Sequence, residues 1–216
     1  MMNFSRLLNF ILGGALIAVT VLLVVSQKPN PEETDATPVL ELKQAEAAVL
    51  KNIATRASVR AFKRDAVPDK LVEKLLKAGM AAPTALNAQP WHFIVIRDHG
   101  QLSSLSVASE YTGLLANAPL AIAVCGDMTK KAPSAEGIYW THDACAASEN
   151  ILLAAHAMGL GATWTGSYPI EARYKLAQKV LSLPDHLIPV SIIAIGYPAI
   201  PVDAKDKWNP QNVSYQ

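Results

Sequence analysis

The chain has 216 residues, a formal net charge of +1 and 51% hydrophobic residues. This length allows one domain of ordinary size with an N-terminal appendage. The lysines and arginines are scattered, so the basic stripe typical of a nucleic-acid-binding protein is missing and no nucleic acid is expected as a partner. The two cysteines, Cys125 and Cys145, are too few for a disulfide scaffold. We interpret them as small core residues, and a bridge between them stays open if the domain is exported.

Residues 7–25 form an uncharged, apolar run. As a helix this run would nearly match the roughly 30 Å core of a bilayer, so it predicts a transmembrane helix. Two interpretations stay open, a retained membrane anchor and a cleaved signal peptide. The anchor is favoured because the run is longer than the ~7–15 apolar residues usual in a signal peptide. Acting as an export signal, it would place the rest of the chain outside the cytoplasm.

We expect three regions along the chain: a membrane anchor or signal segment over residues 1–27, a linker over 28–40, and a folded domain over 41–216. The linker is rich in proline and acidic residues. Such a composition cannot build a core, so an extended and solvated segment is expected there.

Within the domain, apolar residues at helical spacing predict helices, and runs rich in β-branched and aromatic residues predict strands. The expected helices cover residues 44–55, 68–80, 101–108, 142–158 and 170–181. The expected strands cover residues 91–97, 119–127, 162–165 and 188–197. This irregular alternation favours an α+β class, with a small central sheet covered on both faces.

Several common chemistries leave no trace in the sequence. There is no G-x-G-x-x-G, H-E-x-x-H or G-x-S-x-G motif, which argues against a Rossmann site, a zincin and a hydrolase elbow. The five histidines form no short-range metal-ligand pair, so no metal site is expected. Residues 161–167 have the glycine spacing of a P-loop, but Ser167 stands where a lysine must reach the phosphates.

Three stretches carry chemistry suited to a flat, phosphorylated ligand. Arg56, Ser58 and Arg60 would share one face of an extended segment, and guanidinium groups bind phosphate well. Asn87, in the proline-bracketed stretch 82–91, offers an amide that both donates and accepts hydrogen bonds. The glycine-rich stretch 159–166 offers bare backbone N–H groups. The structural alternatives are a solvated basic turn, a turn after a helix, and a helix end leading into a strand.

In combination, these stretches resemble the motifs of the nitroreductase family of FMN enzymes. The matching segments are RASVRAF (56–62), APTALNAQPW (82–91), ENILLAA (149–155) with GLGATWTG (159–166), and KDKWNP (205–210). They occur in the family's order over roughly residues 51–215. Two departures stand out: Ala57 replaces a second arginine common in the family, and His142 stands where relatives often have glutamine.

The resemblance implies a nitroreductase-like three-layer α+β sandwich with a small central, mostly antiparallel sheet flanked by helices. It also implies an intertwined homodimer with FMN at the subunit interface. Arg56, Ser58 and Arg60 would contact FMN through its phosphate, ribityl chain and pyrimidine side, and Lys205 and Lys207 would lie near the phosphate. Pro83 and Thr84 would border the ring of the partner subunit's flavin. Asn87 would meet the polar edge of the ring, and the backbone at Thr165 and Gly166 would face N5 or O4. The full set expected at the cofactor is Arg56, Ser58, Arg60, Pro83, Thr84, Asn87, Thr165, Gly166, Lys205 and Lys207.

The activity that follows from the resemblance is the transfer of two electrons from NAD(P)H to a flat, electron-poor small molecule such as a nitroaromatic compound or a quinone. Donor and acceptor would use the same flavin face in turn, which gives a ping-pong mechanism, and no catalytic side chain is assigned. Two alternatives stay open. One is a membrane-tethered flavin-binding or electron-carrier module without NAD(P)H turnover; the other is a flavin-dependent dehalogenase or a flavin-cleaving relative.

Overall fold

The computed structural model describes residues 31–133 and 137–216. The chain forms two compact units, residues 1–50 and residues 51–216. The described part of the first unit is helical, because helix α2 runs from Pro31 to Thr55. The second unit holds the sheet, the remaining helices and the C-terminal tail.

The conformation predicted for the linker is wrong, because residues 31–40 are helical and not extended. The stretch contains Glu, Ala and Leu, which have high intrinsic helix propensity. Low hydrophobicity therefore excluded a core here, but it did not exclude a helix.

The predicted fold class included a transmembrane helix, and this part of the prediction is wrong for the described residues. Across residues 31–133 and 137–216, no helix is both long enough and apolar enough to span a bilayer. The run that suggested such a helix, residues 7–25, lies outside the described residues. The fold observed is an α+β domain with a four-stranded antiparallel sheet and helices, and the cellular location stays a prediction from the sequence.

The sheet has the strand order β1-β2-β4-β3, and all three strand pairs are antiparallel. The strands are β1 (Trp91–Ile96), β2 (Leu120–Asp127), β3 (Gly161–Gly166) and β4 (Leu187–Gly196). Every residue of the central strand β2 is buried. A near-continuous apolar run is what a strand covered on both faces requires, so the sequence predicted this strand well.

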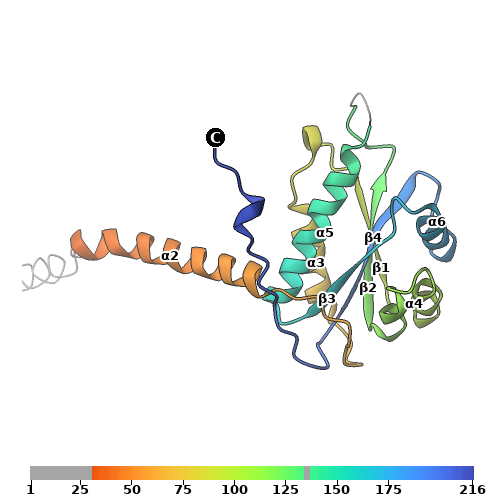
Figure 1. The fold of residues 1–216 in the computed structure, drawn as a ribbon, viewed down its shortest axis with the longest axis horizontal. Coiled ribbons are helices and arrows are strands. Elements are labelled where there is room, and N and C mark those ends of the chain that lie inside the picture. Colours follow the sequence, from red (N-terminus) through yellow and green to blue (C-terminus); the bar gives the residue numbers. More distant parts are fainter. Residues whose placement is uncertain (1–30, 134–136) are drawn as a thin grey trace, which may run out of the picture. The chain divides into compact units, whose positions relative to one another are not determined.

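Helices cover both faces of the sheet (Figure 1). Helices α3 (Asp69–Met80) and α5 (Tyr139–Ala157) lie on one face, and α4 (His99–Ser106) and α6 (Glu171–Val180) lie on the other. Two hydrophobic cores result. Alternate residues of β2 divide between them: Ile122 packs in the core with α3 and α5, whereas Ala121 packs in the core with α4. Three short 3₁₀ helices, η1 (Ala85–Asn87), η2 (Gly113–Asn117) and η3 (Pro210–Asn212), complete the described elements.

Both cysteines are free, so the bridge left open by the sequence is not formed. Cys125 is fully buried in β2, and Cys145 on α5 is partly buried against the core. Burial raises the pKa of the Cys125 thiol to about 12 and also raises the pKa of the Cys145 thiol.

Candidate functional site

An extended segment after α2 runs along the free edge of β3. Ser58 forms a parallel bridge with Ala162, and the N–H of Val59 donates to the carbonyl oxygen of Ala162 at 3.1 Å. Val59 is buried, while Ser58 is half-buried and Arg60 is exposed. The predicted extended conformation therefore exists, and Ser58 and Arg60 keep solvent access on either side of a buried residue.

The end of α2 holds this segment against α5. Asn52 Nδ2 donates to the carbonyl oxygen of Leu153 at 3.0 Å, and Thr55 Oγ1 lies 2.9 Å from His156 Nε2. Arg56 Nε lies 3.6 Å from Glu149 Oε1, also on α5. Glu149 therefore orients the Arg56 side chain, and two contacts fix the last turn of α2 against α5. The segment that follows is preorganised to receive a ligand.

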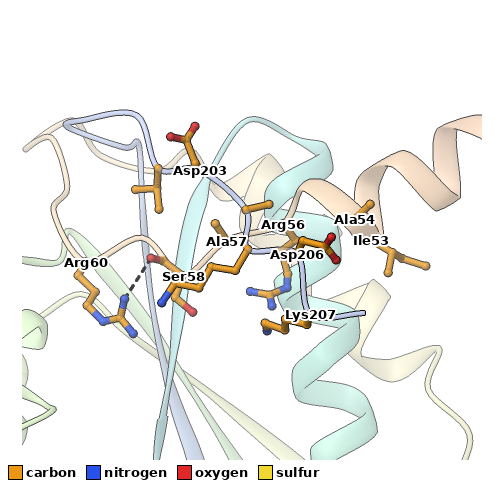
Figure 2. A pocket seen from close by; sticks show the side chains of 12 residues that line it. Ile53, Ala54, Arg56, Ala57, Ser58, Arg60, Asp203, Asp206 and Lys207 are labelled. Atoms are coloured by element: carbon orange, nitrogen blue, oxygen red, sulfur yellow. Dashed lines mark hydrogen bonds between the residues drawn. The ribbon is translucent and has the colours of Figure 1, made fainter. Parts of the chain in front are cut away.

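The segment forms one wall of a cavity of about 750 Å³ (Figure 2). The opposite wall is the C-terminal tail at residues 202–207. This volume lies within the roughly 300–1,000 Å³ usual for small-molecule sites. Of the residues predicted to contact the cofactor, five line this single cavity: Arg56, Ser58, Arg60, Lys205 and Lys207. The fold thus brings the first and the last sequence motifs together.

The cavity carries an excess of positive charge. Its lining has four cationic side chains and two carboxylates, Asp203 and Asp206. Asp206 is already engaged, because its Oδ1 accepts a hydrogen bond from the N–H of Trp208 at 3.0 Å. Two arginines, two lysines and the Ser58 hydroxyl are the donor set that binds a phosphate monoester. The residues present therefore fit the phosphate end of FMN.

A second cavity of about 450 Å³ adjoins the first, because Arg60 lines both. Thr165 and Gly166, at the end of β3, lie in its wall. The Thr165 side chain is buried, and its hydroxyl donates to the carbonyl oxygen of Ile192 at 2.6 Å. A ligand in this cavity would therefore meet the backbone of these two residues, and their contact with FMN stays a prediction.

The third predicted group lies elsewhere. Pro83, Thr84 and Asn87 belong to the loop between α3 and β1, and they line neither of these two cavities. Leu86, Asn87 and nearby Gln89 all have positive φ, at 52°, 53° and 50°. Residues with a Cβ adopt this conformation at a cost, so the loop is held in shape by other contacts.

Two sets of contacts hold the loop. Within it, Gln89 donates from its N–H to Thr84 Oγ1 at 3.1 Å and from Nε2 to Asn87 Oδ1 at 3.1 Å. From outside, Asp143 on α5 accepts the N–H of Ala85 through Oδ1 at 2.9 Å. Asp143 is only 5% exposed, and its Oδ2 has no hydrogen-bond partner in the described chain. Asp143 was not predicted from the sequence, since no local pattern links it to a loop 58 residues away.

An antiparallel sheet covered on both faces, with a cationic cavity at its β3 edge, defines an α+β protein suited to a phosphorylated ligand. The model of the nitroreductase family matches residues 53–110 and 104–197. A protein of Methanothermobacter thermautotrophicus named "Putative NADH dehydrogenase/NAD(P)H nitroreductase" is 41% identical over 172 residues, which cover 79% of this chain and 88% of the relative. The chain belongs to the nitroreductase family.

Solved structures agree with this assignment. A crystal structure of a protein of the same name from Parabacteroides distasonis is 39% identical, with a TM-score of 0.73 over 77% of this chain and 96% of that chain. An FMN-dependent nitroreductase from Clostridium difficile is 30% identical, with a TM-score of 0.68 over 74% of this chain and 94% of that chain. The resemblance inferred from the motifs is confirmed, and so is the prediction, at the level of the family, of a flavin enzyme that uses NAD(P)H.

Proposed function

We propose that this protein binds FMN in the two adjoining cavities and catalyses the NAD(P)H-dependent, two-electron reduction of a flat, electron-poor acceptor such as a quinone or a nitroaromatic compound. The proposal rests on one observation: Arg56, Ser58 and Arg60 line the same cavity as two lysines of the C-terminal tail, Lys205 and Lys207. These residues are separated in the sequence by almost the whole domain. Names of relatives that refer to NADH, NAD(P)H and FMN support it.

Each group of residues has a role in this proposal. When bound, FMN accepts a hydride from the reduced nucleotide and delivers two electrons to an acceptor. Arg56, Lys205 and Lys207 would bind its phosphate, with the Arg56 guanidinium oriented by Glu149. Arg60 lies where the two cavities meet, so its charge would stabilise negative charge on the pyrimidine side of the ring. Donor and acceptor would occupy the same exposed side in turn, as a ping-pong mechanism requires.

The loop of Pro83, Thr84 and Asn87 supports a homodimer within the proposal. It lines neither FMN cavity of its own chain, yet its backbone is fixed in an uncommon conformation and its amide is exposed. A loop contacting the flavin of a second copy would explain both features. We therefore propose an intertwined dimer in which each copy completes the cofactor site of the other.

Steady-state oxidation of NADH and NADPH by the purified full-length protein, with menadione or nitrofurazone as acceptor, tests this function. We expect a yellow protein, acceptor-dependent turnover, and parallel lines in double-reciprocal plots at several acceptor concentrations. Changing Lys205 and Lys207 together to Gln should release FMN, whereas changing Lys175 and Lys179 on α6 to Gln should not. Firmly bound FMN without any NAD(P)H oxidation would contradict the proposal and favour the electron-carrier alternative.

A further inference from the structure

A third cavity, of about 630 Å³, lies beside the candidate flavin site and has no role in the function proposed above. Its polar lining consists mainly of basic side chains from three different segments: Arg60 and Arg64 after α2, Arg97 after β1, and His99 at the start of α4. The rest of its lining is largely apolar and includes Phe62, Leu102 and Pro119. A basic rim around an apolar floor suits a ligand that is both anionic and aromatic.

The basic groups of this cavity are only partly neutralised. No acidic residue is found in its lining, as far as the described chain extends. Arg97 Nη2 donates to Asp69 Oδ1 at 2.7 Å and to the carbonyl oxygen of Val67 at 2.9 Å, so this guanidinium is fixed in place. Arg64 has neither an ion pair nor a hydrogen bond to any described side chain.

Two carboxylates lie close by in the sequence, and neither lines the cavity. Asp98, next to His99, accepts the N–H of Gln101 at 2.8 Å and so caps α4. Asp65, next to Arg64, is exposed and lies outside the lining of the cavity. An unneutralised guanidinium held beside a fixed one is a common arrangement for binding phosphate.

The floor of the cavity is rigid. A Cβ built on Gly196 would lie 2.7 Å from Pro119 Cγ and 3.1 Å from Phe62 Cδ1, so these segments are in close contact. The N–H of Lys63 donates to the carbonyl oxygen of Tyr197 at 2.8 Å and holds the same segments together. A flat ring placed on Phe62 or Pro119 would therefore rest on a preformed surface.

Arg60 lines all three cavities, so the third cavity directly adjoins the site proposed for FMN. We infer that this basic cavity binds the phosphate-bearing adenosine half of the pyridine nucleotide while the nicotinamide half reaches the flavin. This inference rests on the proposed function. In it, Arg64, Arg97 and His99 bind phosphate groups, and the adenine rests on the apolar floor.

The test compares three reductants and one fragment on the full-length protein. Reduced nicotinamide mononucleotide lacks the adenosine half, whereas NADH and NADPH contain it. In a double variant, Arg64→Glu with His99→Gln, we expect the KM for NADPH to rise at least about tenfold, because a charge-assisted phosphate contact becomes a repulsion. The KM for the mononucleotide should change less than about twofold. Arg97 is left intact because its contacts to Asp69 and Val67 are structural.

Binding of 2′,5′-ADP, measured by calorimetry, tests the cavity independently of turnover. The wild-type protein should bind this fragment, and the double variant should bind it at least about tenfold more weakly. Lys74→Glu on α3, which makes the same charge change outside the three cavities, should affect neither measurement. Failure of the wild type to bind 2′,5′-ADP, or an equal rise in KM for NADPH and for the mononucleotide, would overturn the inference. Loss of turnover with every reductant would instead overturn the proposed function.

Discussion

Asp143 shows how a single buried side chain can shape a distant part of the site. Its Oδ1 accepts the N–H of Ala85, the residue just before three positions with positive φ. Without this acceptor, the loop would lose its tie to α5 at the half-buried Ala85, and the uncommon backbone conformation would lose support. We therefore regard Asp143 as a positioning residue for the loop that carries Asn87.

Replacing Asp143 with Ala should lower the free energy of unfolding by about 0.5–1.5 kcal/mol, the usual net contribution of one hydrogen bond, because the Ala85 donor is only half-buried. Urea unfolding of the wild type and the variant measures this difference. Asp143→Asn keeps a carbonyl oxygen for the Ala85 N–H and should be affected less. Equal stability of the Ala variant and the wild type would show that the hydrogen bond does not hold the loop.

Cys125 yields a prediction about pH. Burial in β2 raises the pKa of its thiol to about 12 from an ordinary value of 9.0. In the native protein the thiol therefore stays protonated at pH 9, whereas in the unfolded chain about half of it ionises. Iodoacetamide at pH 9 should label Cys125 only after denaturation, as read by mass spectrometry of the peptides.

The raised pKa of Cys125 also makes the free energy of unfolding fall as pH rises from about 9 towards about 12. Rapid labelling of folded protein at Cys125 would contradict this account.

At the scale of elements, the contact between the segment Ser58–Arg60 and β3 decides the shape of the site. Gly161 permits this contact, because a Cβ there would lie 2.6 Å from both Cβ and Cγ1 of Val59. The strand edge and the cofactor segment approach closely only when this position has no side chain. The role of Gly161 is therefore steric: its missing side chain leaves room for Val59, so the segment that carries the arginines can lie against β3.

Gly161→Ala should destabilise the fold by about 1–3 kcal/mol through overpacking, and should weaken FMN binding because Ser58 and Arg60 move. Thermal unfolding and flavin fluorescence measure the two effects. Gly100→Ala on α4 serves as a control, since the nearest atom to its Cβ is the side-chain oxygen of Asp98 at 3.1 Å. Identical behaviour of both variants would show that the close approach at β3 is unimportant.

The sequence predicted the regular elements well where periodicity was strong. Each of the four strands was found with ends within one residue, because buried strands such as β2 leave continuous apolar runs. Helix α2 was predicted only from residue 44, since the preceding acidic and proline-rich stretch has no apolar period. Local patterns cannot reveal partners distant in sequence, which is why Asp143 was missed while the tail lysines were found only through the family resemblance.

At the scale of the whole molecule, the proposal requires two copies of the chain. Leu86 is 79% exposed at the tip of the loop next to Asn87, and the C-terminal tail leaves Trp208 and Tyr215 exposed at 73% and 93%. In the proposed dimer these exposed side chains would be available for burial against the second copy. In the proposed dimer the loop would meet the flavin of the partner.

Leu86→Glu should therefore shift the protein from dimer to monomer at micromolar concentrations and weaken FMN binding in the same samples. Placing an unpaired carboxylate at a dry interface costs several kcal/mol of association energy. Sedimentation velocity measures the oligomeric state. Val107→Glu is the control, because Val107 is 77% exposed on another part of the domain. Wild-type protein that is monomeric and still saturated with FMN would contradict the dimer.

The account depends on the cationic cavity between residues 56–60 and 202–207. The most direct test is to titrate the flavin-free, full-length protein with FMN and with riboflavin, which differ only in the phosphate. Two charge-assisted contacts, each contributing about 1.5–3 kcal/mol, should make FMN bind at least about a hundredfold more tightly. Equal dissociation constants for the two flavins would show that Arg56, Lys205 and Lys207 do not bind the phosphate.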